Sequence, residues 1–128
     1  MKRSPIAKMS KKRKAQIPQR KKVIEFVMDR DGGWCQAALP GICRVQATDV
    51  HEILTRARGG SILDPDNCLS LCRPCHSWIT DHPGWSRDHG FTISSWTSGA
   101  EVLAAARARE AWLFGPRNME EFEDEETA

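Results

Sequence analysis

The sequence predicts a small α+β domain stabilised by a bound metal, and three observations support this prediction. The chain has 128 residues, which suffices for one ordinary domain and is too short for two independent cores. Segments with helical periodicity alternate with short segments of strand character. Four of the five cysteines form two pairs. Because only 40% of the residues are hydrophobic, we expect a modest core to which a metal adds stability.

The charges are segregated along the chain. Residues 1–22 contain ten Lys or Arg and no acidic residue, whereas residues 119–128 contain six acidic residues and no basic one. Blocks of like charge commonly act as interaction arms, so a polyanion, DNA in particular, is the expected partner of the basic block. A tail that only aids solubility is the alternative. The candidate DNA contacts in this block are Lys11, Lys12, Arg13 and Lys14.

This charge pattern divides the chain into three regions. We expect a disordered basic arm at 1–18, a single domain at 19–114 and an acidic tail at 115–128. Within this domain we expect a central part at 34–83, which carries the motif described below, and a helical extension at 84–114.

Periodicity and turn residues predict the elements of the domain. A helix is expected over 19–30, because Val23, Ile24, Val27 and Met28 form one stripe before a Gly-Gly stop. The segment 48–55 alternates like a strand, with Asp49 and His51 on one face and Val50 and Glu52 on the other. The other expected elements are a short mixed segment at 34–38, a helical turn at 68–71, a helix at 73–80, a candidate strand at 91–96 and an Ala-rich helix at 100–114, whose candidate packing residues are Val102, Leu103, Ala106, Trp112 and Leu113.

The cysteines indicate a zinc site. Seven residues separate Cys35 from Cys43, 28 residues follow, and Cys72 and Cys75 then form a tight C-x-x-C before a helix. Four thiolates around a structural zinc suit this arrangement, although the first spacing is longer than usual. The fifth cysteine, Cys68, is interpreted as a small core residue.

A set of residues in fixed order follows the first cysteine pair: His51, Gly59-Gly60, Asn67 and the block Leu71-Cys72-Arg73-Pro74-Cys75-His76. This set resembles the signature of the HNH (ββα-metal) nucleases, especially their zinc-stapled phage-type members. The resemblance implies a ββα-metal core in which His51 and His76 hold one catalytic ion, Mg²⁺ or Mn²⁺. It also implies that Asn67 braces a loop by hydrogen bonds to backbone.

The sequence departs from the family pattern at the general base. Relatives often have Asp-His or His-His in the first strand, where the first residue is a metal ligand and the second is the base. Here His51 aligns with the ligand, and Glu52 stands in the place of the base. In the alternative interpretation, His51 is the base and Asp49 is the ligand. Thr80 replaces a further ligand histidine of some relatives, so we expect more water on the ion, which suits Mg²⁺ or Mn²⁺.

The resemblance implies a metal-dependent DNA endonuclease that nicks or cuts phosphodiester bonds with loose sequence preference. It also implies a role in phage genome processing or packaging beside a terminase. Arg56, Arg58 and Arg73 are candidate phosphate contacts. The alternative is a non-catalytic four-cysteine zinc module that binds nucleic acid or a partner protein, which Glu52 at the base position favours. A restriction-type enzyme with a defined site is a third hypothesis.

The sequence predicts a cytoplasmic protein that does not contact a membrane, in the host cytoplasm if it is phage-encoded. No apolar run approaches the roughly 20 residues that a membrane span needs, and no apolar stretch follows the N-terminal charges as in a signal peptide. In a reducing compartment, an odd number of cysteines favours metal binding over disulfides.

Overall fold

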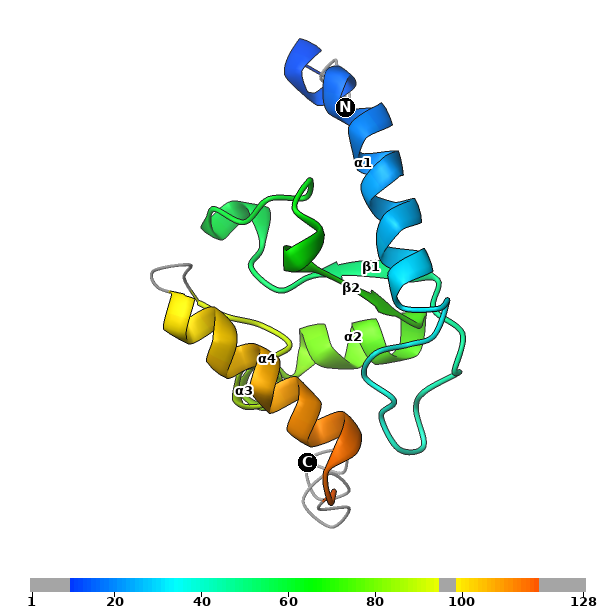
Figure 1. Ribbon diagram of the computed structural model, residues 1–128, viewed down its shortest axis with the longest axis vertical. Helices are drawn as coiled ribbons and strands as arrows, with labels where there is room; N and C mark the ends of the chain where they lie inside the picture. The colour runs from blue at the N-terminus through cyan, green and yellow to red at the C-terminus, as the bar shows by residue number, and fades with distance from the viewer. Residues whose placement is uncertain (1–9, 95–98, 118–128) are drawn as a thin grey trace, which may run out of the picture.

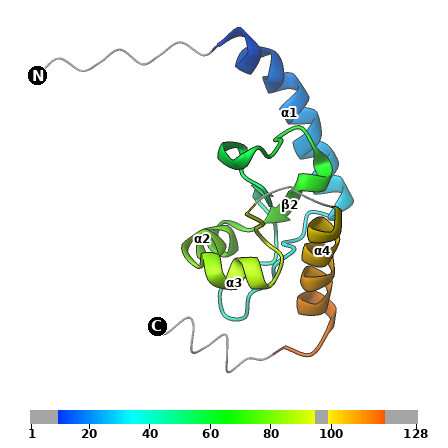
Figure 2. The same cartoon turned by 90° about the vertical axis from the view of Figure 1, so that its left-hand side faces the viewer.

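A computed structural model describes residues 10–94 and 99–117 (Figures 1 and 2). It confirms a small α+β fold with one two-stranded antiparallel sheet. The elements in chain order are α1 (Lys11–Arg30), β1 (Asp49–Glu52), the 3-10 helices η1 (Arg56–Arg58) and η2 (Pro65–Asn67), β2 (Cys68–Leu71), α2 (Arg73–Asp81), α3 (Pro83–Asp88) and α4 (Gly99–Phe114). None of the described helices is long and apolar enough to cross a membrane.

The sheet lies between two helices. In β1 and β2, Asp49 pairs with Leu71 and Glu52 pairs with Cys68. On one face, Val50 and Cys68 pack against Val23 and Val27 of α1. On the other face, β2 packs against α2, so that α1 and α2 lie on opposite sides of the strands (Figure 1). Each strand therefore presents one set of alternating side chains to each helix.

The main core joins the sheet to the three C-terminal helices. Trp85 of α3 and Trp112 of α4 form an edge-to-face contact at 5.1 Å between ring centroids, and Phe91 packs beside them fully buried. The indole N–H of Trp112 donates to the carbonyl of Ala37 at 2.6 Å. This contact ties α4 to the cysteine-bearing loop before β1.

Helix α1 begins earlier than the sequence analysis predicts, so the expectation of disorder is wrong for residues 11–18. Ser10 caps the helix by accepting a hydrogen bond from the backbone N–H of Arg13 at 3.1 Å. The Lys, Arg, Ala and Gln residues that follow are strong helix formers, and the helix continues through Pro18 despite the lost backbone donor. The rest of the predicted arm, residues 1–9, lies outside the described residues.

The predicted helical turn at 68–71 is also wrong, because these residues form β2 and pair with β1. The helical turn lies just before them, in η2, where the Asp64 side chain accepts from the N–H of Asp66 at 3.0 Å. The mixed segment 34–38 contributes only a single bridge, between Trp34 and Gln46.

The C-terminal part agrees with the prediction in its helix and differs in detail. The helix 100–114 is present as α4, and Trp112 is buried as expected. Leu103 is half exposed, whereas Ala105 is buried instead. No strand forms over 91–94, and residues 95–98 lie outside the described part. Arg117, placed in the acidic tail by the sequence, packs its guanidinium 4.6 Å from the ring centroid of Trp112, while residues 118–128 are not described.

Candidate functional site

The four cysteines predicted as zinc ligands converge. The Sγ atoms of Cys35, Cys43, Cys72 and Cys75 all lie within 4.8 Å of one another. Cys35 and Cys43 come from the loop before β1, Cys72 caps α2, and Cys75 lies in its first turn. This donor set fits a tetrahedral zinc, for which four thiolates are a common structural ligand set. Cys68 lies elsewhere, in the apolar cluster beneath α1.

Hydrogen bonds and burial shift the pKa values within the cysteine cluster in opposite directions. A hydrogen bond from the thiol of Cys75 lowers the pKa of Cys35 to about 4, and the same contact raises the pKa of Cys75. The backbone N–H of Arg44 donates to Cys72 Sγ at 3.4 Å, and the N–H of Val45 donates to Cys43 Sγ at 3.3 Å. Backbone donors aimed at sulfur favour the thiolate, which is the form that binds a metal, whereas burial raises the pKa of Cys43.

A second cluster of titratable groups forms where β1 faces α2. Asp49 and His51 lie on the strand face toward α2, as the alternation predicts, and His76 faces them from the helix. The His76 Nδ1 lies 2.8 Å from the Asp49 carboxylate, and the rings of His51 and His76 are 5.2 Å apart at their centroids. The structure therefore brings together three of the predicted site residues.

The Asp49 carboxylate is held ionised by its neighbours. Burial raises its pKa, but hydrogen bonds from His76 and Thr48 and the positive charge of Arg73 outweigh that effect, so its pKa lies below the ordinary value. Arg73 Nε lies 3.2 Å from the same carboxylate oxygen. The Asp49 carboxylate and Nδ1 of His76 therefore lie close enough to act as two ligands of one cation. Carboxylate oxygens and imidazole nitrogens are both common metal ligands.

His51 is almost fully buried, and its ring is oriented by backbone. Its Nε2 lies 2.6 Å from the carbonyl oxygen of Phe91. Since a carbonyl only accepts, Nε2 carries the proton and Nδ1 is the basic nitrogen. Burial lowers the pKa of His51 to about 4, against a smaller opposing effect of the Phe91 carbonyl. His51 is therefore neutral near pH 7.

Glu52 does not join this cluster. It lies on the opposite face of β1, where its carboxylate is 3.8 Å from Arg20 Nη2 of α1. The Arg20 guanidinium also donates to the carbonyl of Ile62, and this bond links α1 to the loop after η1. The structure thus separates the two residues that the sequence left as candidates for the base, and only His51 faces His76.

Asn67 is buried and braces the loop after β1. Its Oδ1 accepts from the N–H of Leu54 at 2.8 Å, and its Nδ2 donates to the carbonyls of Leu54 and Ser61 at 2.9 and 3.1 Å. Gly60 lies in the same contact, because a Cβ there would sit 1.8 Å from the Leu54 oxygen. Gly59 has a φ of 95°, a left-handed conformation that favours glycine. The glycine pair and Asn67 therefore fix one compact loop.

A cavity of about 210 Å³ opens beside His51. Arg58 and Arg87 both line it, and Thr80 lines it from the turn of α2 after His76. Arg73 lies near Asp49 as predicted, whereas Arg56 faces away, into a groove against α1.

Three contributors to the site are absent from the sequence analysis. The Phe91 carbonyl orients His51 across 40 residues of sequence, and a backbone oxygen has no sequence signature. Arg87 lies in the sequence shortly after the motif, and its positive charge was a signal for a further phosphate contact. Arg109, whose pKa burial lowers, donates to the carbonyl of Gly90 next to Phe91.

The chain matches no family model, no curated protein and no solved structure.

Proposed function

We propose that this protein is a metal-dependent endonuclease of the HNH type that hydrolyses phosphodiester bonds in DNA. The observation that carries the proposal is the convergence of Asp49 and His51 of β1 with His76 of α2, next to a cavity lined by arginines. The resemblance in residues 49–76 supports the same class. The terminase and packaging partners rest on that resemblance alone.

We further propose that the four cysteines hold a structural zinc. Two of the ligands come from the loop before β1 and two from the start of α2, so the metal would fix the position of His76, which follows Cys75 directly. The zinc thus supports the catalytic cluster through the fold and takes no part in the reaction.

In this mechanism Asp49 and His76 would hold a divalent cation. A carboxylate oxygen and one imidazole nitrogen, completed by water, suit Mg²⁺ or Mn²⁺. When bound, the cation stabilises negative charge on the scissile phosphate and on the leaving oxygen. We assign the cation to Asp49 and His76, whose Oδ2 and Nδ1 lie 2.8 Å apart, and assign His51, whose ring centroid lies 5.2 Å from that of His76, the role of base.

His51 is the general base. Its Nδ1 accepts a proton from a water molecule whose oxygen attacks phosphorus, while Nε2 stays bonded to Phe91. The bond from phosphorus to the 3′ oxygen breaks, and that oxygen takes a proton from solvent. Burial keeps the ring neutral and the carbonyl fixes its tautomer, so Nδ1 is unprotonated before the reaction. Arg58 and Arg87 line the same cavity and contact the phosphate.

Cleavage of supercoiled plasmid tests the function. Purified zinc-loaded protein is incubated with Mg²⁺ or with Mn²⁺, and a parallel reaction omits both ions. We expect nicked or linear DNA only with an added ion, and loss of at least about 100-fold in rate for His76→Ala. Zinc content and circular dichroism of the variant show whether it retains its fold.

Two results would contradict the proposal. An inert plasmid with both ions would favour the non-catalytic zinc module. Equal cleavage by His76→Ala and the parent protein would show that the activity comes from another site or from a contaminant. Discrete fragments from a long substrate, instead of a smear, would replace loose sequence preference with a defined site.

A further inference from the structure

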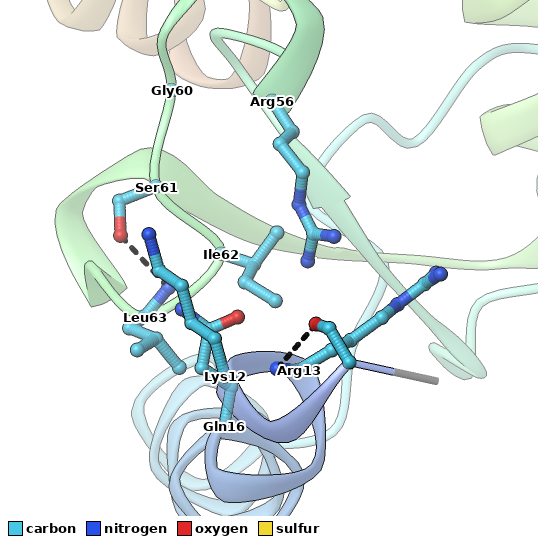
Figure 3. Close-up of a pocket in the computed structure, with 9 residues that line it drawn as sticks. Lys12, Arg13, Gln16, Arg56, Gly60, Ser61, Ile62 and Leu63 are labelled. Atoms are coloured by element: carbon cyan, nitrogen blue, oxygen red, sulfur yellow. Dashed lines mark hydrogen bonds between the residues drawn. The ribbon is translucent and has the colours of Figure 1, made fainter. Parts of the chain in front are cut away.

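A groove runs between the first half of α1 and the loop from η1 to Leu63. One part has a volume of about 360 Å³ and is lined by Lys12, Arg13 and Gln16 of α1 and by Arg56 and residues 60–63 from the loop. Figure 3 shows the Arg56 side chain reaching from η1 toward α1, with Lys12 alongside Ser61 on the other side. The helical start of α1 creates this groove, because a disordered arm would not hold these cations in place.

The groove concentrates positive charge without a counterion. Its lining contains three basic side chains and no acidic residue. Within residues 10–94 and 99–117, the side chains of Lys12, Arg13 and Arg56 form no ion pair and no hydrogen bond; only the backbone N–H of Arg13 is bonded, to Ser10. Cations gathered in one place repel each other, so this arrangement favours an anion that bridges them.

The loop that forms one wall of the groove also forms a wall of the His51 cavity. Arg56 and Arg58 lie two residues apart in η1, yet Arg56 lines the groove and Arg58 lines the cavity. Asn67 holds this loop by its bonds to Leu54 and Ser61. A ligand with regularly spaced negative charges would therefore contact both sides of one rigid loop.

We propose that the groove binds backbone phosphates of duplex DNA away from the scissile bond and so anchors the substrate. This inference rests on the proposed function, since it names how that substrate is held. In this proposal Arg56 contacts DNA in the groove and is not a residue of the catalytic cavity. Phosphate contacts of this kind fix position and carry no base specificity, which agrees with loose sequence preference.

The lining favours a duplex over other partners. The adjoining part of the groove is lined by Ile17, Ile24 and Ile62 between basic side chains, and neither part contains an aromatic residue on which unpaired bases could stack. The acidic residues 119–128 of this chain have the complementary charge, but the C-terminal end of α4 and the start of α1 lie at opposite ends of the described structure (Figure 1). DNA is the anion that the proposed catalytic site already requires.

The test is equilibrium binding, measured by fluorescence anisotropy with a labelled duplex of about 30 base pairs and Ca²⁺ in place of Mg²⁺ to prevent cleavage. The variant carries Lys12→Gln, Arg13→Gln and Arg56→Gln. All three side chains are exposed, so their loss leaves the fold intact. We expect Kd to rise at least about tenfold near 100 mM salt, and the slope of log K against log salt to fall by about 2 to 3.

A matched variant removes the same charge elsewhere. Lys22, Arg44 and Arg107 are exposed and line none of these cavities, so Lys22→Gln, Arg44→Gln and Arg107→Gln together test the effect of net charge alone. We expect this variant to change Kd by less than about threefold and to leave the salt slope close to that of the parent.

Equal effects of the two triple variants would overturn the proposal, because binding would then follow net charge and not the groove. A groove variant that binds DNA normally but no longer binds a synthetic peptide of residues 118–128 would also overturn it and assign the groove to an acidic protein segment. The measurement needs no cleavage. A protein that binds through the groove and leaves plasmid intact would therefore refute the nuclease and not the anchor.

Discussion

The side chain of Asn67 forms two hydrogen bonds with the backbone of Leu54, one to its N–H at 2.8 Å and one to its carbonyl at 2.9 Å. Asn67 thus takes the place of a neighbouring strand for a residue just beyond the end of β1. The third bond, to Ser61, closes the loop that carries Arg56 and Arg58. One buried amide therefore positions basic side chains on two surfaces.

Replacing Asn67 with Ala should lower the free energy of unfolding by about 3 kcal/mol. Two buried backbone groups of Leu54 lose their partner, and each unsatisfied group costs about 1 to 3 kcal/mol. Urea unfolding of the zinc-loaded protein measures the change. The neighbouring Asp66→Asn is the control, since its side chain is exposed and should change stability by less than about 0.5 kcal/mol. Equal stability of the two variants would contradict the role of Asn67.

The cysteine cluster predicts which cysteine can be replaced without loss of zinc. Cys72→Ser should abolish binding of one zinc per chain and destabilise the fold by several kcal/mol, because the proposed zinc would join the loop before β1 to α2. Cys68→Ala should keep the zinc, since Cys68 packs with Val23 and Val27 on the far side of the sheet. Elemental analysis and thermal unfolding distinguish the two. A chain that retains its zinc after Cys72→Ser would refute the ligand set.

The turn that follows Cys43 contains a strained residue. Val45 has a φ of 73°, a left-handed conformation that is unfavourable for a β-branched side chain. Val45→Gly should therefore stabilise the zinc-loaded protein by about 1 kcal/mol, as measured by urea unfolding. Arg44→Gly is the matched control, because Arg44 has no positive φ and should lose stability through the flexibility of glycine. Destabilisation by both changes would show that the turn holds no such strain.

Local patterns predicted much of the fold. The helix α2 follows from Pro74 at its start, the faces of β1 follow from strict alternation, and the cysteine cluster follows from spacing. The strand β2 was missed because its four residues carry no period of their own, and its pairing with β1 alone makes them a strand. The start of α1 was missed because a run of like charge suggested disorder, whereas the Ser10 cap and helix propensity decided otherwise.

The candidate site was predictable in its residue types and not in its geometry. The sequence identified Asp49, His51 and His76, but could not tell that Arg56 and Arg58 line different surfaces, since that depends on the fold of one short 3-10 helix. The Phe91 carbonyl, which sets the tautomer of His51, comes from a segment 40 residues away. Long-range backbone contacts of this kind leave no trace in the sequence.

Asp49 and Glu52, which lie close to His51 in β1, give the sharpest test of the catalytic roles. Glu52 pairs with Arg20 on the face away from His76, so Glu52→Gln should keep cleavage within about threefold of the parent. Asp49→Asn keeps the shape of the side chain and removes the charge that would hold the cation, so it should raise the Mg²⁺ concentration needed for half-maximal cleavage by about 10-fold to 100-fold. Plasmid cleavage across a Mg²⁺ titration measures both effects. If Glu52→Gln abolished cleavage at every Mg²⁺ concentration while Asp49→Asn left the titration unchanged, Glu52 would be the base and the assignment of His51 would be wrong.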